Sequence, residues 1–256
     1  MSDIEVEMKG EITWIRLNRP ERMNAYDATM AKALIEAIRS ASRSGVIVIS
    51  GTGRAFCAGG YLANLSNPDP EELRSMFYGS LDVYESIRTS PRPVIAAVNG
   101  AAVGGGNELV VACDLAIAAE SATFGQTGVR IGSAPVLGGT NFLTMNIGEK
   151  RAKEVAFLCR RYKAQEACEM GWINAVVPDD HLEDEVTKWA EELLCMSPRY
   201  LEIAKASSNV WWNQCRDAYL SGLGMLVQAI GSEDMIEGAS AFLEKRRPQF
   251  KGRAKK

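Results

Sequence analysis

The chain has 256 residues, 46% of them hydrophobic, and its 29 Lys and Arg against 32 Asp and Glu give a formal net charge of −3. This balance excludes a strongly basic nucleic-acid-binding protein and a polybasic membrane-surface protein. No run approaches the roughly 18 apolar residues of a membrane span, and the N-terminus lacks the apolar core of a signal peptide. We therefore expect a cytoplasmic protein with no nucleic-acid or membrane partner.

The hydrophobic pattern predicts short strands that alternate with helices over two thirds of the chain, followed by helices alone. The predicted strands are Ile4–Met8, Ile12–Leu17, Val46–Ser50, Val94–Val98, Leu115–Ala119 and Asn174–Val177. A first helix is predicted after Asp27, a second over Glu71–Arg88, and a third that begins near Gly105. The remaining predicted helices are Glu149–Arg160, Ala164–Met170, Leu182–Met196, Arg199–Val210, Gln214–Ile230 and Ser232–Arg246. This order predicts an α/β core over residues 1–195, with a doubly wound sheet as one possible arrangement, and a helical C-terminal subdomain over 196–256.

One stretch brings chemically useful groups together. The buried strand Val94–Val98 is followed by a glycine turn and by a helix that begins near Gly105. The first N–H groups of a helix have no intrahelical partner and lie at the positive end of its dipole, so they can receive a developing negative oxygen. Glu108 follows about one turn later among apolar neighbours, and a carboxylate in such surroundings is either paired or functional.

Other mechanisms find little support in the residue pattern. The only histidine, His181, follows Asp179 and Asp180 in a charged segment, which argues against a Ser-His-Asp or Cys-His mechanism. The six cysteines include no Cys-x-x-Cys pair, so we expect neither a disulfide framework nor a metal site. The segment that begins at Gly51 resembles the dinucleotide-binding motif Gly-x-Gly-x-x-Gly, but Phe56 stands in place of the third glycine. The sequence therefore contains no motif for binding a nicotinamide or flavin cofactor.

From about Ile12 to Phe250 the motifs resemble those of the crotonase (enoyl-CoA hydratase/isomerase) superfamily. The motifs that carry the resemblance are Leu17-Asn-Arg-Pro-Glu-Arg-Met-Asn-Ala25, Ala55-Phe-Cys-Ala-Gly-Gly60, Pro93-Val-Ile-Ala-Ala-Val-Asn-Gly100, Gly104-Gly-Gly-Asn-Glu108, Cys113-Asp114, Phe124-Gly-Gln126 and Phe242-Leu-Glu-Lys-Arg246. The resemblance implies a spiral of ββα units, which replaces the doubly wound arrangement, and a C-terminal helical region that forms homotrimers, often paired into hexamers. It also implies an acyl-CoA substrate and no separate cofactor, because coenzyme A enters as part of the substrate.

The family's motif positions assign roles to residues of this chain. In the family, two backbone N–H groups hold the thioester oxygen, and the matching residues in this chain are Gly60 and Gly105. Glu108 matches the first of the family's two catalytic glutamates. One such donor typically lowers the barrier by on the order of 3 kcal/mol. The residues implied to contact the CoA moiety or the acyl group are Arg22, Met23, Ala58, Tyr61, Leu62, Gly128 and Lys245, the last of which reaches the CoA of a neighbouring subunit.

The second catalytic glutamate is missing. The family's hydratases carry Phe-Gly-Gln-Pro-Glu where this chain has Phe124-Gly-Gln-Thr-Gly128, which is similar to 1,4-dihydroxy-2-naphthoyl-CoA synthase and 2-ketocyclohexanecarboxyl-CoA hydrolase. That branch, however, lacks a glutamate at the position of Glu108 and commonly has an aspartate soon after its Gly-Ser, whereas Ser133 is followed by Ala134-Pro135. Tyr61 also stands where aspartate is usual. The chain thus combines features of two branches.

These features lead to three hypotheses. The first is a hydratase or dehydratase that acts on a bulky, cyclic or aromatic α,β-unsaturated acyl-CoA, with Glu108 as its only carboxylate and with Glu108, a water near Gly128, or Ser133 as proton donor. The second is ring-forming or ring-cleaving chemistry on a cyclic β-ketoacyl-CoA or an aryl acyl-CoA. The third is a non-catalytic CoA-binding or RNA-associated scaffold.

Overall fold

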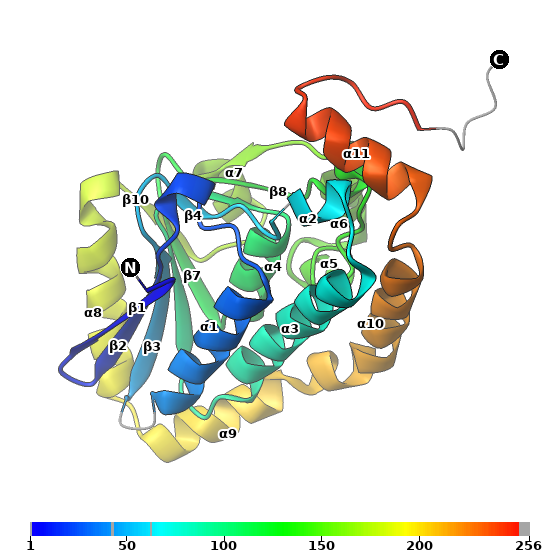
Figure 1. Ribbon diagram of the computed structural model, residues 1–256. Helices are drawn as coiled ribbons and strands as arrows, with labels where there is room; N and C mark the ends of the chain where they lie inside the picture. The colour runs from blue at the N-terminus through cyan, green and yellow to red at the C-terminus, as the bar shows by residue number, and fades with distance from the viewer. Residues whose placement is uncertain (1, 42–43, 62, 251–256) are drawn as a thin grey trace.

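The computed structural model describes residues 2–41, 44–61 and 63–250. Within these ranges the larger sheet has six strands in the order β1-β2-β3-β5-β7-β10 (Figure 1). The strands are β1 (Ile4–Lys9), β2 (Ile12–Leu17), β3 (Val46–Gly51), β5 (Val94–Val98), β7 (Leu115–Ala119) and β10 (Ala175–Val177). The first two form an antiparallel hairpin around Gly10, as predicted, and the other neighbouring strands are parallel.

A smaller sheet has the strand order β4-β6-β8-β9. Its strands are β4 (Ala55–Cys57), β6 (Ala101–Val103), β8 (Thr123–Gly125) and β9 (Tyr162–Lys163). A long strand of the large sheet is followed three times by a short strand of the small sheet, as β3-β4, β5-β6 and β7-β8, with helices after each pair. This repeat confirms the expected spiral of ββα units, and the doubly wound arrangement is wrong because the short strands leave the main sheet.

The predicted helices occur in the expected order, and two short helices, α2 and α5, were not predicted. They are α1 (Ala28–Ser40), α2 (Ala63–Ser66), α3 (Pro70–Thr89), α4 (Gly105–Ala112), α5 (Phe142–Ile147), α6 (Glu149–Leu158), α7 (Ala164–Glu169), α8 (Leu182–Leu194), α9 (Pro198–Ser208), α10 (Val210–Gln228) and α11 (Glu233–Leu243). Short 3-10 helices cover Pro20–Arg22, Gly128–Ile131 and Asp179–His181. The Asp27 side chain accepts a hydrogen bond from the Met30 N–H at 3.0 Å and caps α1, as predicted.

The central strands β3 and β5 of the large sheet are buried on both faces, because their side chains alternate between two cores, whereas the edge strand β1 is exposed after Ile4. From β3, Ile47 and Ile49 point into the main core with α1, α3 and α4, whereas Val46 and Val48 pack under α8. Figure 1 shows α8 on one side of this sheet and α1 and α3 on the other. This arrangement explains why Val46–Ser50 is a continuous β-branched and apolar run.

The C-terminal helices pack onto this core. Trp212 of α10 stacks on Phe142 with ring centroids 3.9 Å apart, and α11 contacts α2 and the 3-10 helix at Gly128–Ile131. The division into residues 1–195 and 196–256 stays a prediction. No helix in the described part of the chain is long and apolar enough to cross a membrane.

Candidate active site

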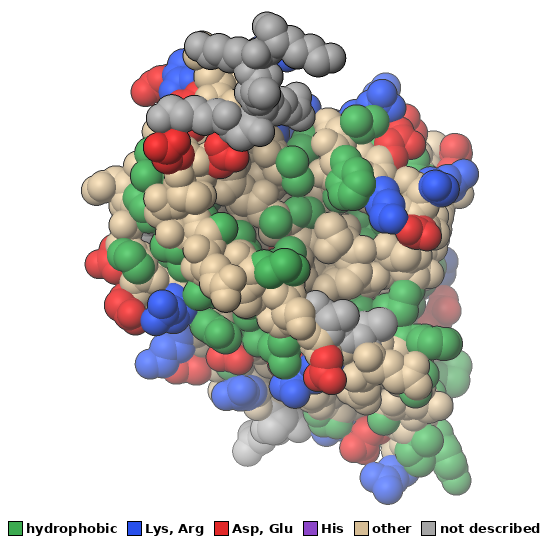
Figure 2. All heavy atoms as spheres, turned by 90° about the vertical axis from the view of Figure 1, so that its right-hand side faces the viewer, with side chains coloured by type: hydrophobic (Ala, Val, Ile, Leu, Met, Phe, Trp, Pro, Cys, Tyr) green, Lys and Arg blue, Asp and Glu red, His purple; other side chains and the backbone are tan. Residues whose placement is uncertain are grey.

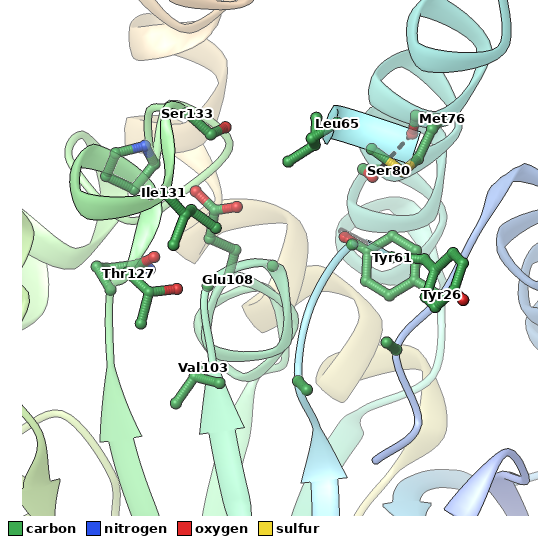
Figure 3. A pocket seen from close by; sticks show the side chains of 18 of the residues that line it. Tyr26, Tyr61, Leu65, Met76, Ser80, Val103, Glu108, Thr127, Ile131 and Ser133 are labelled. Atoms are coloured by element: carbon green, nitrogen blue, oxygen red, sulfur yellow. Dashed lines mark hydrogen bonds between the residues drawn. The ribbon is translucent and has the colours of Figure 1, made fainter. Parts of the chain in front are cut away.

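A cavity of about 480 Å³ lies between α4, α3 and the segment that follows β8, with α2, α10 and α11 at its outer side. Figure 3 shows Glu108, Thr127, Ile131 and Ser133 on one side and Leu65, Met76, Ser80, Tyr26 and Tyr61 on the other. Most predicted site residues line this cavity, namely Arg22, Met23, Ala58, Gly60, Tyr61, Gly105, Glu108, Gly128 and Ser133. Leu62 lies outside the described residues, and Lys245, just past the end of α11, is not among the lining residues.

The Gly60 N–H is directed away from its neighbouring chain segment. Gly60 forms a parallel bridge with Tyr26, in which the Tyr26 N–H donates to the Gly59 carbonyl at 2.9 Å and the Tyr61 N–H donates to the Tyr26 carbonyl at 3.1 Å. Because peptide groups alternate along an extended chain, the Gly60 N–H points to the opposite side, where Gly60 lines the cavity. It has no acceptor among the described residues.

The second N–H group comes from the start of α4. Gly105 is the first residue of this helix, so its N–H has no intrahelical acceptor, and it lies at the positive end of the helix dipole. A Cβ on Gly59 would lie 2.8 Å from the Gly105 nitrogen, which shows how closely the Gly59-Gly60 segment approaches the start of α4. The structure therefore brings both predicted N–H donors to one wall of the cavity.

Packing also requires glycine at the start of α4. A Cβ on Gly106 would lie 2.0 Å from the Cys57 carbonyl oxygen of β4, and a Cβ on Gly105 would lie 2.5 Å from the Tyr26 hydroxyl. From the sequence, a functional role for these glycines is favoured over close packing, because each costs up to about 1 kcal/mol relative to alanine in a helix. The structure shows that Gly106 is required by close packing against β4, while its neighbour Gly105 also lines the cavity.

Glu108 is buried and firmly held. Its Oε1 accepts hydrogen bonds from the N–H groups of Leu137 at 3.0 Å and Gly139 at 3.1 Å. Burial raises the pKa of Glu108 to about 8, although these two hydrogen bonds oppose the rise by favouring the charged form. The carboxylate projects into the cavity (Figure 3), and Oε2 has no hydrogen-bond partner among the described residues. Glu108 is thus a carboxyl group that titrates at mildly basic pH.

The loop after β8 lies close to Gly128, the position where the family's hydratases carry their second glutamate. A Cβ on Gly128 would lie 3.3 Å from three backbone atoms of Ala134, so this loop borders Gly128 closely. The Ser133 N–H donates to the Gly128 carbonyl at 2.9 Å, and the Ser133 side chain points into the cavity (Figure 3). Together these contacts hold Gly128 and Ser133 side by side on the wall next to Glu108.

Several cavity residues were not predicted from the sequence. Gln126 is fully buried, lines the cavity, and has no partner for either amide atom among the described side chains and backbone. Tyr26 also lines the cavity, beside Gly105. The Phe-Gly-Gln motif included Gln126 as a residue of the family pattern, but gave no indication of its environment. Nothing in the pattern around Tyr26 distinguishes it from a residue of the hydrophobic core.

The mouth of the cavity is charged and aromatic. The Arg22 guanidinium lies 4.5 Å from the centre of the Tyr61 ring, and Arg54 and Arg161 also line the cavity. Positive charge at this position suits a ligand that carries phosphate groups. His181 is exposed and is not among the lining residues. No cluster of three His, Cys, Asp or Glu side chains that could hold a metal ion occurs in the described ranges.

Comparisons with known proteins agree with this geometry. The family model described as enoyl-CoA hydratase/isomerase matches residues 7–253. An enoyl-CoA hydratase from Bacillus anthracis is 34% identical, with 98% of this chain and 100% of that chain covered and a TM-score of 0.79. A carnitinyl-CoA hydratase from Mycobacterium avium is 31% identical, with 98% and 99% covered and a TM-score of 0.85. The chain therefore belongs to the enoyl-CoA hydratase/isomerase family, the crotonase superfamily indicated by its motifs, and is an enoyl-CoA hydratase-like enzyme.

Proposed function

We propose that this enzyme adds water to, or removes it from, an α,β-unsaturated acyl-CoA whose acyl group is bulky, cyclic or aromatic. The observation that carries the proposal is Glu108, a buried carboxylate with one oxygen held by two N–H groups and the other facing the cavity that Gly60 and Gly105 also line. A base fixed in this way needs no rearrangement when the reaction begins.

In the hydration direction, Glu108 takes a proton from water as the water oxygen attacks C3 of the enoyl thioester. The electron pair of the C2–C3 double bond moves onto the thioester oxygen, and the N–H groups of Gly60 and Gly105 stabilise the resulting enolate. A proton then reaches C2. Its donor is Glu108 itself, a water bound near Gly128, or Ser133. Glu108, Gly128 and Ser133 all line the cavity.

The size and lining of the cavity support a bulky acyl group. The apolar side chains on its walls are Leu65, Met76, Phe77, Ile131, Leu137 and Leu226, together with Phe242 and Leu243 of α11. The volume of about 480 Å³ is in the range of pockets that enclose whole small-molecule ligands. A ring would gain free energy from contact with these walls, whereas a short linear chain would leave much of the space to water.

A second candidate is cleavage or formation of a ring in a cyclic β-ketoacyl-CoA or aryl acyl-CoA. Gly128 favours it, because the second carboxylate of the family's hydratases is absent at this position. Glu108 favours hydration, because a fixed base that can activate water is retained. Loss of both activities in a folded, CoA-binding protein would support the remaining hypothesis of a non-catalytic scaffold.

The test is the loss of enoyl-thioester absorbance over a panel that runs from crotonyl-CoA to aryl- and ring-substituted enoyl-CoAs, with wild type compared with Glu108→Gln. We expect wild type to hydrate the ring-substituted members fastest, and the variant to lose at least about 10³-fold in rate while still binding coenzyme A. If folded, CoA-binding wild type hydrates no member but turns over a cyclic β-ketoacyl-CoA, the second candidate replaces the first.

We also propose that the enzyme works as a homotrimer, or as a hexamer built from two trimers. In support, α10 and α11 expose large apolar side chains, among them Trp211, Met225, Phe242 and Leu243. The face that carries these helices has hydrophobic side chains across it (Figure 2). Light scattering coupled to size exclusion tests this proposal, and a monomer at micromolar concentration would overturn it.

A further inference from the structure

A chain of buried hydroxyl groups leads from the cavity wall to the start of α4. The hydroxyl oxygens of Tyr26 and Tyr84 lie 3.1 Å apart, and the Tyr84 hydroxyl donates to the Gly105 carbonyl at 3.0 Å. A phenol has a single proton, and Tyr84 uses it for Gly105. The proton between the two hydroxyls must therefore come from Tyr26, which gives a chain that runs in one direction from Tyr26 to Tyr84 to Gly105.

Both tyrosines are too buried to act as acids or bases in this chain. Tyr26 and Tyr84 are 8% and 1% exposed. Burial raises the pKa of each phenol well above its ordinary value, so both remain neutral over the working pH range. Although Tyr26 lines the cavity, its proton is directed inward to Tyr84. The structure thus indicates a role in holding the backbone and not in proton transfer.

The start of α4 needs such support. Its N-cap residue, Gly104, has no side chain to cap the helix, and glycine continues through Gly105 and Gly106. A helix that begins in this way tends to fray, because glycine restricts the backbone least and leaves the first N–H groups unheld. Tyr84 holds the Gly105 carbonyl, and the Tyr26 hydroxyl lies against the Gly105 Cα, 2.5 Å from where a Cβ would stand.

We propose that Tyr26 and Tyr84 are positioning residues for the reaction. Tyr84 holds the Gly105–Gly106 peptide group through the Gly105 carbonyl, and Tyr26 lies against the Gly105 Cα. Because the preceding peptide group meets this one at the same Cα, the two tyrosines orient the Gly105 N–H toward the thioester oxygen. An N–H donor stabilises an enolate only when it is already aimed at the oxygen, and small displacements reduce its effect. The inference rests on the proposed function, in which Gly105 is one of the two donors.

The first test compares Tyr84→Phe and Tyr26→Phe with Tyr78→Phe, an exposed tyrosine of α3 that does not line the cavity. With the panel member that wild type hydrates fastest, we expect kcat to fall about tenfold to thirtyfold in the first two variants, with KM changed less than threefold. Tyr78→Phe should match wild type. Equal kcat in all three variants would overturn the proposal.

A second readout needs no turnover. Benzoyl-CoA carrying a ¹³C-labelled thioester carbonyl reports hydrogen bonding through the shift of its infrared carbonyl band on binding. We expect a downshift in wild type and in Tyr78→Phe and a clearly smaller one in Tyr84→Phe. If hydration fails throughout the panel but this pattern holds, the proposed function falls and the positioning role stands. An equal downshift in every variant would exclude the positioning role.

A double variant tests the contact itself. Gly105→Ala should lower hydration to a small residual rate, because its Cβ meets the Tyr26 hydroxyl, while Gly105→Ala with Tyr26→Phe should raise that rate at least about fivefold, since the nearest atom is then gone. This comparison also tests the positioning role if Tyr84→Phe does not fold. Identical residual activity in the single and double variants, with both folded by circular dichroism, would show that the hydroxyl does not set the position of Gly105.

Discussion

The inner wall and the mouth of the cavity are built in opposite ways. At the inner wall, Gly105 and Glu108 sit on one short helix, and backbone N–H groups of Leu137 and Gly139 fix the carboxylate. At the mouth, Arg22 is exposed and its guanidinium lies over the Tyr61 ring. We therefore propose a division of tasks, in which the wall held by backbone hydrogen bonds carries the reaction and the charged mouth binds the CoA part of the substrate.

The largest effect should appear in stability, because the inner wall buries an ionisable group. The pKa of Glu108 is raised from 4.5 to about 8. Between these values the unfolded chain has lost the proton and the folded chain still holds it, so stability falls as pH rises. Relative to Glu108→Gln, the free energy of unfolding of wild type should decline by roughly 4 to 5 kcal/mol between pH 4.5 and 8, and then stay level.

Denaturant unfolding of both proteins at a series of pH values measures this difference. Glu71→Gln, an exposed carboxylate on α3, serves as the control and should follow wild type. A constant difference between wild type and Glu108→Gln across the range would show that Glu108 is ionised in the folded protein at low pH, and the inner wall would then be less isolated from water than the structure indicates.

The next effect concerns rate. A base with a pKa of about 8 is mostly protonated at pH 6, so kcat/KM for hydration should rise about 100-fold from pH 6 to pH 9, with half of the maximum near pH 8. Initial rates in buffers of constant ionic strength provide the profile. A flat profile over this range would mean that Glu108 in the free enzyme is already ionised at pH 6, which is incompatible with a pKa of about 8.

The smallest effect should come from the mouth. Arg22→Ala removes a cation that lies on the Tyr61 ring and faces the cavity, so KM for the acyl-CoA should rise about threefold to tenfold with kcat nearly unchanged. Arg74→Ala, which removes an exposed arginine of α3, controls for net charge. A fall in kcat as large as the rise in KM would contradict the division between wall and mouth.

The sequence predicted the long elements well and the short ones poorly. The β3 and β5 strands and the α3 helix were found because their patterns extend over five residues or more. The strands of the smaller sheet have two or three residues each, too few to show alternation, and the α5 helix, six residues long and directly after a glycine-rich segment, was missed. Pairing with neighbours far along the chain, and not local preference, makes these short segments strands.

The residues of the site were likewise predictable only where they lie close together in the sequence or in a family motif. Gly105 and Glu108 could be predicted because one helix carries both, and Gly60 was added by the family motif. The hydroxyl chain could not be predicted, because Tyr26 and Tyr84 lie in different parts of the sequence and each fits a core position. Their relation to Gly105 arises only from tertiary packing.

The separation of the site's parts along the chain has a consequence for how the enzyme becomes active. The Gly60 and Gly105 N–H groups come from successive ββα units, and Glu108 is held by Leu137 and Gly139 from a later segment. Contacts between distant segments pay the entropy of loop closure and form late in folding. During refolding, catalytic activity should thus be among the last properties to return, after helical structure has been regained.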